Sequence, residues 1–256
     1  MNTRRNFVRG LTGIGAIVAT GHAPAIVRSA LAARGTMLGG ARAWTNPYVT
    51  DGLVAMWDGE WNVAGGVHDA NANIWADLVG SNSFGNFATD VTFGENYIDL
   101  PPKVPAATNV GLSPSAISTI EAVVSLSGWD GLVLAVFSVG GISNVQRWLG
   151  FRVNKTFNFG NNFLCAPFPA NTNEVFYVAG VFTGTSWELY YNGVQVSNIG
   201  PGMNWGSSLN GIPSLMTGGS SVSASKIYSM RLSSRQLTSS EIAANYSVDK
   251  ERFNLP

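Results

Sequence analysis

The chain has 256 residues and no formal net charge at pH 7, because 15 basic residues balance 15 acidic ones. Only 12% of the residues are charged, and 30 glycines, 11 prolines and 8 tryptophans suit short strands and polar turns better than helices. Six basic residues precede the first acid, Asp51, so the remaining body is mildly acidic. A body without basic clusters argues against nucleic acid as a partner, since phosphates are bound by grouped Lys and Arg.

The first 43 residues differ from the rest in composition. The stretch TRRNFVR (3–9) resembles the twin-arginine export motif, and an apolar, glycine-rich run (11–20) and small residues (30–32) follow it. This pattern predicts a signal that exports the protein to the periplasm, the cell surface or the medium. No uninterrupted apolar stretch is long enough to predict a transmembrane segment.

The alternative is that residues 1–43 form a helical arm that the protein keeps. Ile26, Val27, Ala30 and Leu31 lie at helical spacing, and such a stripe could dock on the body or on a neighbouring subunit. We therefore divide the chain into residues 1–43, a leader or arm, and residues 44–256, one folded domain.

Strand-like segments recur through this domain between turns rich in Gly, Pro and Asn. Eight of them are long enough to build two packed sheets. They are residues 53–57, 91–100, 118–126, 132–139, 148–153, 175–182, 188–196 and 225–232.

One β-hairpin is predicted with particular precision. Asn192-Gly193 stands between two strand-like runs, and both residues tolerate the positive φ that a two-residue type I′ turn demands. Before the turn, Trp187, Leu189 and Tyr191 alternate with more polar neighbours. This period of two predicts a strand with one face towards a core.

The C-terminal region predicts a strand followed by a helix. Strict alternation in residues 225–232 would place residues 227, 229 and 231 on one face and residues 228, 230 and 232 on the other. Thr238 and Glu241 fit a capping box, in which each side chain binds the other's backbone N–H. A short helix over residues 239–246 is expected.

Several of these segments together resemble the laminin G-like domains of the concanavalin A-like jelly-roll class. They are DGLVAMWDG (51–59), NIWADLVG (73–80), LYYNGVQV (189–196) and KIYSMRLSSRQLTSSEIAANY (226–246). The resemblance covers roughly residues 48–253. It implies an all-β fold, a two-sheet antiparallel β-sandwich with a short C-terminal helix.

A polar loop after the first strand suggests a metal site. Asp58 precedes the run Asp69, Asn71, Asn73, whose alternating oxygens suit a hard cation such as calcium. Laminin G-like relatives often hold calcium at a loop edge. The alternative is an Asx-rich turn whose side chains bind their own backbone.

Three tryptophans in turn-like sequence are candidates for stacking on sugar rings. They are Trp61, Trp129 and Trp205, the last with Asn204 as a hydrogen-bonding neighbour. The alternative is that each folds back onto the body. The strand settings of four other tryptophans predict core positions: Trp57, Trp75, Trp148 and Trp187.

Catalytic groups are sparse in the sequence. His68 is the one histidine of the body, in a loop where bracing or solvation is its expected role. Glycoside hydrolysis needs two facing carboxylates, and the strands carry isolated acids such as Glu121, Asp99 and Glu188. We therefore do not expect an enzyme, and a glycoside hydrolase stays as an alternative.

The leading hypothesis is a non-catalytic recognition module that binds a glycan or a cell surface through its loops, with calcium as a candidate cofactor. A second hypothesis is a structural or adhesive subunit of a larger assembly, such as a phage fibre or decoration protein, anchored in the virion by its N-terminal arm. Such a subunit would be a homo-oligomer or an assembly component. One fold hosts many functions, so the site must decide between them.

Overall fold

A computed structural model provides the structure of this chain. It describes residues 44–85, 87, 91–100, 107–108, 117–127, 134–139, 147–152, 156–159, 163–167, 171–184, 186–199, 213–215 and 225–256. The predicted leader lies outside these residues. No helix in the described ranges is long and apolar enough to cross a membrane.

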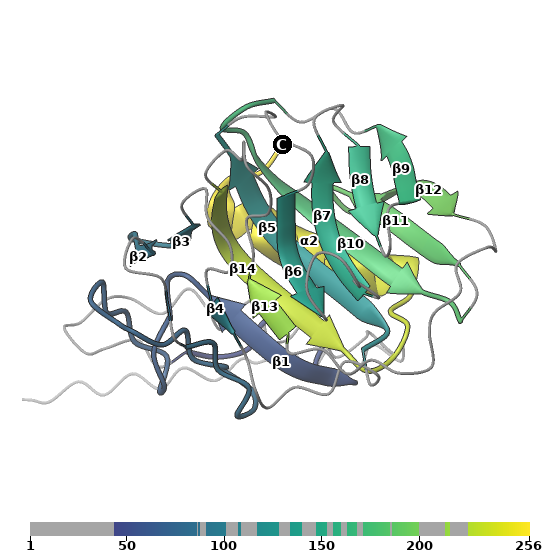
Figure 1. The fold of residues 1–256 in the computed structure, drawn as a ribbon. Helices are drawn as coiled ribbons and strands as arrows, with labels where there is room; N and C mark the ends of the chain where they lie inside the picture. The colour runs from purple at the N-terminus through teal and green to yellow at the C-terminus, as the bar shows by residue number, and fades with distance from the viewer. Residues whose placement is uncertain are drawn as a thin grey trace, which may run out of the picture. The chain divides into compact units, whose positions relative to one another are not determined.

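Within the described residues, the larger of two antiparallel sheets has eight strands (Figure 1). Its order is β12-β11-β10-β5-β14-β3-β2, with β1 also paired to β14. The strands are β1 (Leu53–Asp58), β2 (Thr92–Phe93), β3 (Ile98–Leu100), β5 (Thr119–Leu126), β10 (Val175–Phe182), β11 (Trp187–Tyr191), β12 (Val194–Ile199) and β14 (Ser225–Ser233).

The smaller sheet has six strands in the order β4-β13-β6-β7-β8-β9. They are β4 (Ala107–Thr108), β6 (Leu134–Val139), β7 (Arg147–Arg152), β8 (Thr156–Phe159), β9 (Phe163–Pro167) and β13 (Pro213–Leu215). Phe151 of β7 packs edge-on against Phe176 of β10, with ring centroids 5.6 Å apart. The two sheets therefore share a core, and the predicted all-β sandwich is confirmed.

Aromatic side chains fill much of the core between the sheets. Trp57 and Phe84 have ring centroids 4.8 Å apart, and Trp75 packs beside both. These rings and Trp187 are fully buried, which confirms three of the predicted core tryptophans. The side chain of Trp148 lies outside what the structure describes.

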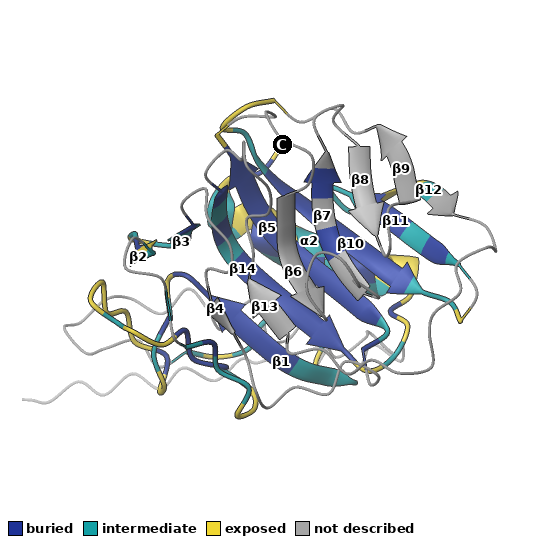
Figure 2. Ribbon diagram, in the orientation of Figure 1, coloured by how far each residue is buried: buried dark blue, intermediate teal, exposed yellow. Residues whose placement is uncertain are grey.

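The larger sheet is also covered on its outer face, which the sequence did not predict. A second buried cluster, including Val123, Tyr177 and Tyr190, packs with Ile242 of the C-terminal helix. All eight residues of β5 are consequently buried (Figure 2). The predicted face of the strand before Asn192 is confirmed, since Trp187 and Leu189 are buried in the core between the sheets and Tyr191 packs against it. Its other face, which carries Tyr190, is buried as well, in the second cluster.

The predicted hairpin is confirmed. Asn192 and Gly193 have φ values of 46° and 77°, and Tyr191 pairs with Val194 across the turn. Gly193 also has a packing role, since a Cβ there would lie 2.5 Å from Cδ1 of Tyr246. The turn therefore fits beneath the helix only without a side chain.

A β-bulge in β14 changes the predicted alternation of its side chains. Ile227 pairs with Val124 of β5, but Ser229 pairs with the next residue, Val123, so Tyr228 is the extra residue. Ile227 therefore joins Met230 and Leu232 in the core between the sheets. The prediction of strict alternation is wrong, since an inserted residue reverses the phase.

The C-terminal helix α2 (Ser239–Phe253) begins at the predicted capping box. The Thr238 hydroxyl accepts from the Glu241 N–H, and the Glu241 carboxylate accepts from the Thr238 N–H. The helix continues beyond the predicted end at Tyr246 and stops at Asn254, which adopts the left-handed conformation. Its last turn carries Arg252, which positions the candidate site.

Candidate functional site

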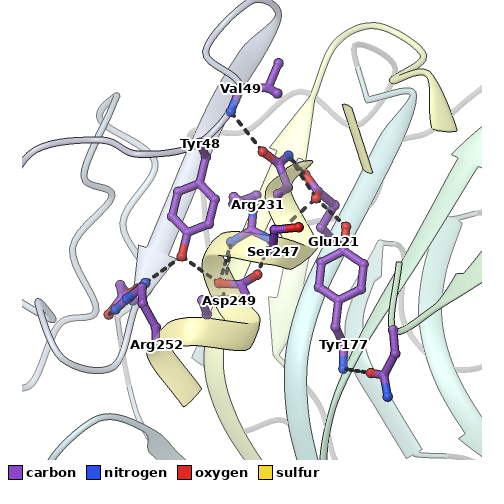
Figure 3. A network of polar contacts seen from close by, with 12 residues as sticks. Tyr48, Val49, Glu121, Tyr177, Arg231, Ser247, Asp249 and Arg252 are labelled. Carbon is purple, nitrogen blue, oxygen red and sulfur yellow. Dashed lines mark hydrogen bonds and ion pairs between the residues drawn. The ribbon is translucent and has the colours of Figure 1, made fainter. Parts of the chain in front are cut away.

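A network of buried charges lies between α2 and the larger sheet (Figure 3). At its centre, Arg231 of β14 donates to Asp249 of α2 at 2.6 Å and lies 3.4 Å from Glu121 of β5. All three side chains are buried, and the Arg231 guanidinium lies 3.9 Å from the centroid of the Tyr48 ring. The network therefore joins β5, β14, α2 and the segment before β1.

Glu121 has further partners in this network. Asn245 donates to both of its oxygens, at 3.0 and 3.1 Å, and the Tyr177 hydroxyl donates at 2.5 Å. Burial, together with the neighbouring Glu121, raises the pKa of Tyr177 well above its usual value, so the hydroxyl stays a donor. The sequence predicted no second acid beside Glu121 on its own strand and left pairing between strands open; in the structure its partners Arg231, Tyr177 and Asn245 come from distant parts of the chain.

Arg252 connects this network with the molecular surface. It donates to both oxygens of Asp58 at 2.7 and 3.0 Å, to the Tyr48 hydroxyl at 2.6 Å, and to Glu60 at 3.1 Å. Asp58 is buried, and burial raises its pKa although Arg252 acts in the opposite direction. Arg252 therefore serves as the buried counterion of Asp58 and as a clamp on the loop that follows β1.

The same guanidinium lies among aromatic rings. Its Cζ atom is 4.4 Å from the ring centroid of Trp61 and 4.6 Å from that of Phe253. Trp61 contacts Trp44 edge-on, with centroids 6.5 Å apart. These contacts hold Trp61 against the end of α2 while leaving its side chain partly exposed.

Ring contacts continue from Phe253 to the turn between β2 and β3. The ring centroids of Phe253 and Tyr228 are 5.5 Å apart, and those of Tyr228 and Tyr97 are 5.6 Å apart. Lys226 places its Nζ 4.1 Å from the Tyr97 centroid. All the aromatic residues in this series are partly exposed. We call them the aromatic row: Trp44, Trp61, Phe253, Tyr228 and Tyr97.

Two glycines allow the loops of the aromatic row to approach each other. A Cβ on Gly59 would lie 2.4 Å from the backbone N and Cα of Tyr97, and the Gly59 N–H donates to the Tyr228 carbonyl at 2.8 Å. A Cβ on Gly66, whose φ is +71°, would lie 2.4 Å from the Cβ of Trp44. Close backbone approach of this kind is available only to glycine.

Of the predicted sugar-binding residues, the structure describes only Trp61. Trp61 belongs to the aromatic row, whereas Trp129, Trp205 and Asn204 lie outside the described residues. Sequence reasoning missed the other members of the row. Tyr97 and Tyr228 were expected as ordinary strand residues, and the edge-on contact of Trp44 with Trp61 has no sequence signal.

The predicted metal ligands differ in burial and in their partners. Asp58 is buried and bound by Arg252, whereas Asp69, Asn71 and Asn73 are exposed. Asp69 accepts from the backbone N–H of Asn71 at 2.9 Å, as in an Asx turn. Within the described ranges, no group of three His, Cys, Asp or Glu side chains is placed to hold a metal ion. Calcium binding by this loop stays a prediction.

The buried part of the same loop is fixed by one amide. Asn62 accepts from the Asp69 N–H at 2.8 Å and donates to the Asp69 carbonyl at 2.7 Å. The exposed His68 has its Nδ1 3.2 Å from the Gly59 carbonyl oxygen, a loop-bracing contact.

Comparison with known proteins gives a fold and no family. No family model and no curated protein matches the chain. Among solved structures, Trypanosoma rangeli sialidase with the inhibitor DANA is 16% identical over 86% of this chain and 37% of its own, with a TM-score of 0.60. The HCR/D W1238A mutant is 13% identical over 78% of this chain and 52% of its own, with a TM-score of 0.58.

The chain thus spans about a third to a half of the structures it resembles. At these identities the likeness shows a shared sandwich fold. The laminin G-like assignment stays a prediction, since no family model supports it.

Proposed function

We propose that this chain is a non-catalytic glycan-binding module and that the aromatic row is its contact surface. The carrying observation is a series of five partly exposed rings from elements far apart in sequence. Ring contacts join Trp44 to Trp61 and Phe253 to Tyr228 and Tyr97, and the Arg252 guanidinium lies near both Trp61 and Phe253. Flat rings bind the apolar C–H faces of sugars, while polar groups at their edges bind hydroxyls. Arg252 restrains Trp61 before any ligand arrives, which lowers the entropy cost of binding.

The proposal assigns no catalytic residue. Asp58 and Glu60, the acids beside Trp61, both bind Arg252, and Asp58 is buried. A glycoside hydrolase needs one carboxyl group to donate a proton and a second to attack or activate water. Carboxylates held as ion-pair partners of one guanidinium are poorly placed for both tasks.

The sialidase structures include a complex with sialic acid, which makes a saccharide a reasonable class of ligand for this fold. We further propose that residues 1–43 direct export, because a cell-surface or extracellular glycan is reached from outside the cell. N-terminal sequencing of the secreted protein tests this part: a start near Arg34 supports export, and a retained Met1 contradicts it.

A glycan array probed with the purified chain, followed by calorimetry on the glycans that bind, tests the binding function. Trp61→Ala and Tyr97→Ala should each weaken binding by about tenfold or more, roughly the worth of one ring contact. Tyr246→Ala is the matched control, since Tyr246 is a partly exposed ring that contacts Tyr177 outside the row. Binding that survives both row variants would contradict the proposal.

A further inference from the structure

We infer that the aromatic row takes an uncharged glycan and discriminates against acidic ones. This inference rests on the proposed function and adds the chemical class of the ligand. It follows from the charges that the structure places along the row.

The first cation of the row, Arg252, already has carboxylate partners within the protein. Arg252 donates to Asp58, Glu60 and Tyr48, and its side chain is only 14% exposed. An incoming carboxylate or sulfate would have to displace Asp58 or Glu60 to reach it. Such displacement would leave a carboxylate without its counterion, and for buried Asp58 the cost would be large.

Lys226 is the other cation of the described row. Its ammonium lies over the Tyr97 ring, and Asp99 of β3 is its partner in the strand register. A carboxylate on the facing residue of the neighbouring strand offsets part of the ammonium charge towards a ligand. Neither cation is therefore available to an acidic sugar without competition.

Acidic groups remain accessible beside the same rings. Glu60 is adjacent to Trp61 and its side chain is 48% exposed. Glu95 is exposed in the turn that contains Tyr97, where the Gly94 N–H donates to the Tyr97 carbonyl at 2.8 Å. Of the carboxylates named here, Glu60 and Glu95 are exposed, whereas Asp58 is buried and bound by Arg252. Carboxylates accept hydrogen bonds from hydroxyls and repel other anions.

The experiment compares matched neutral and acidic ligands on the whole chain. Calorimetry would use lactose against sialyllactose, and galactotetraose against tetragalacturonate, beside neutral chitotetraose. The neutral ligand of each pair should bind about tenfold more tightly than the acidic one at low ionic strength. Added salt should reduce this difference in affinity, because it screens the repulsion between the charges. The double variant Glu60→Gln, Glu95→Gln should also reduce the difference in affinity between neutral and acidic ligands, since glutamine keeps the side-chain shape and removes the charge.

Three results would overturn the inference. Equal or tighter binding of the acidic members, lost in Trp61→Ala, would refute it and leave the proposed function standing. A neutral preference that the glutamine double variant leaves unchanged would show that these carboxylates do not set it. Absence of binding to every glycan of the array, or binding unaffected by both Trp61→Ala and Tyr97→Ala, would remove the proposed function and this inference together.

Discussion

The guanidinium carbon of Arg252 lies 4.4 Å from the centroid of the Trp61 ring. This contact ties the loop after β1 to the last turn of α2, almost two hundred residues later in the chain. The site and the stability of the helix are therefore coupled through one side chain.

Replacing Arg252 should reveal that coupling. Arg252→Met leaves buried Asp58 without its counterion, so we expect the free energy of unfolding to fall by about 3 kcal/mol. Urea denaturation measures the change. Adding Asp58→Asn should recover part of the loss, because the second substitution removes the unpaired charge. A double variant less stable than Arg252→Met alone would contradict this account.

The central ion pairs should matter more than an exposed one. Arg231→Met leaves the buried Glu121 and Asp249 without their cationic partner, and we expect the free energy of unfolding to fall by about 4 kcal/mol. Arg235→Met is the matched control, since Arg235 pairs with Asp51 and Glu241 near the surface. That change should cost about 1 kcal/mol or less. Equal effects in urea denaturation would show that burial is not decisive.

Glu241 should give the protein an acid-sensitive component of stability. The hydrogen bond from Arg235 is the largest cause that lowers its pKa, from 4.5 to about 2. The stabilising contribution is fully present above pH 4.5 and is lost as the pH falls towards 2, because the unfolded chain takes up the proton first.

The measurement for Glu241 is the stability difference between the native sequence and Glu241→Gln across that range. Glutamine can still accept from the Thr238 N–H, so the cap is kept while the charge is removed. We expect the native chain to be more stable near neutral pH and the difference to shrink as the pH falls. A difference that does not depend on pH would refute the assignment.

Gly193 has both a positive φ and no room for a side chain, whereas Gly184 has only the positive φ. Gly193→Ala places a Cβ at positive φ and 2.5 Å from the Tyr246 ring, so both strain and overlap are expected. Gly184 also has positive φ, but a Cβ added there would meet nothing within 4 Å. Thermal unfolding should show a cost of about 1 kcal/mol for Gly184→Ala and a cost larger by about 1 kcal/mol or more for Gly193→Ala. Equal costs for the two variants would mean that the overlap with Tyr246 is relieved by a small shift of the hairpin turn or of the ring.

Features fixed by neighbouring residues were predictable from the sequence. The Asn192-Gly193 turn and the Thr238–Glu241 cap both involve residues within a few positions, and both are confirmed. The two-sheet antiparallel sandwich was also predictable, because strand-like segments and turns repeat through the domain.

What escaped prediction depends on residues far apart. The bulge at Tyr228 inserts a residue into an otherwise regular strand and leaves no composition signal. Glu121 meets Arg231 and Asn245 only after the C-terminal segment has packed. The aromatic row likewise needs the Gly59 turn to touch the Tyr97 turn, a contact that no local pattern encodes.

The position of β14 has a consequence for biosynthesis. This strand borders β5 on one side and both β1 and β3 on the other, yet its residues are made after all three partners. A growing polypeptide that has not reached Ser225 holds β1 and β5 without the strand that joins them. Completion of the larger sheet must therefore wait until translation has passed β14, and until then the unpaired edges need protection from aggregation.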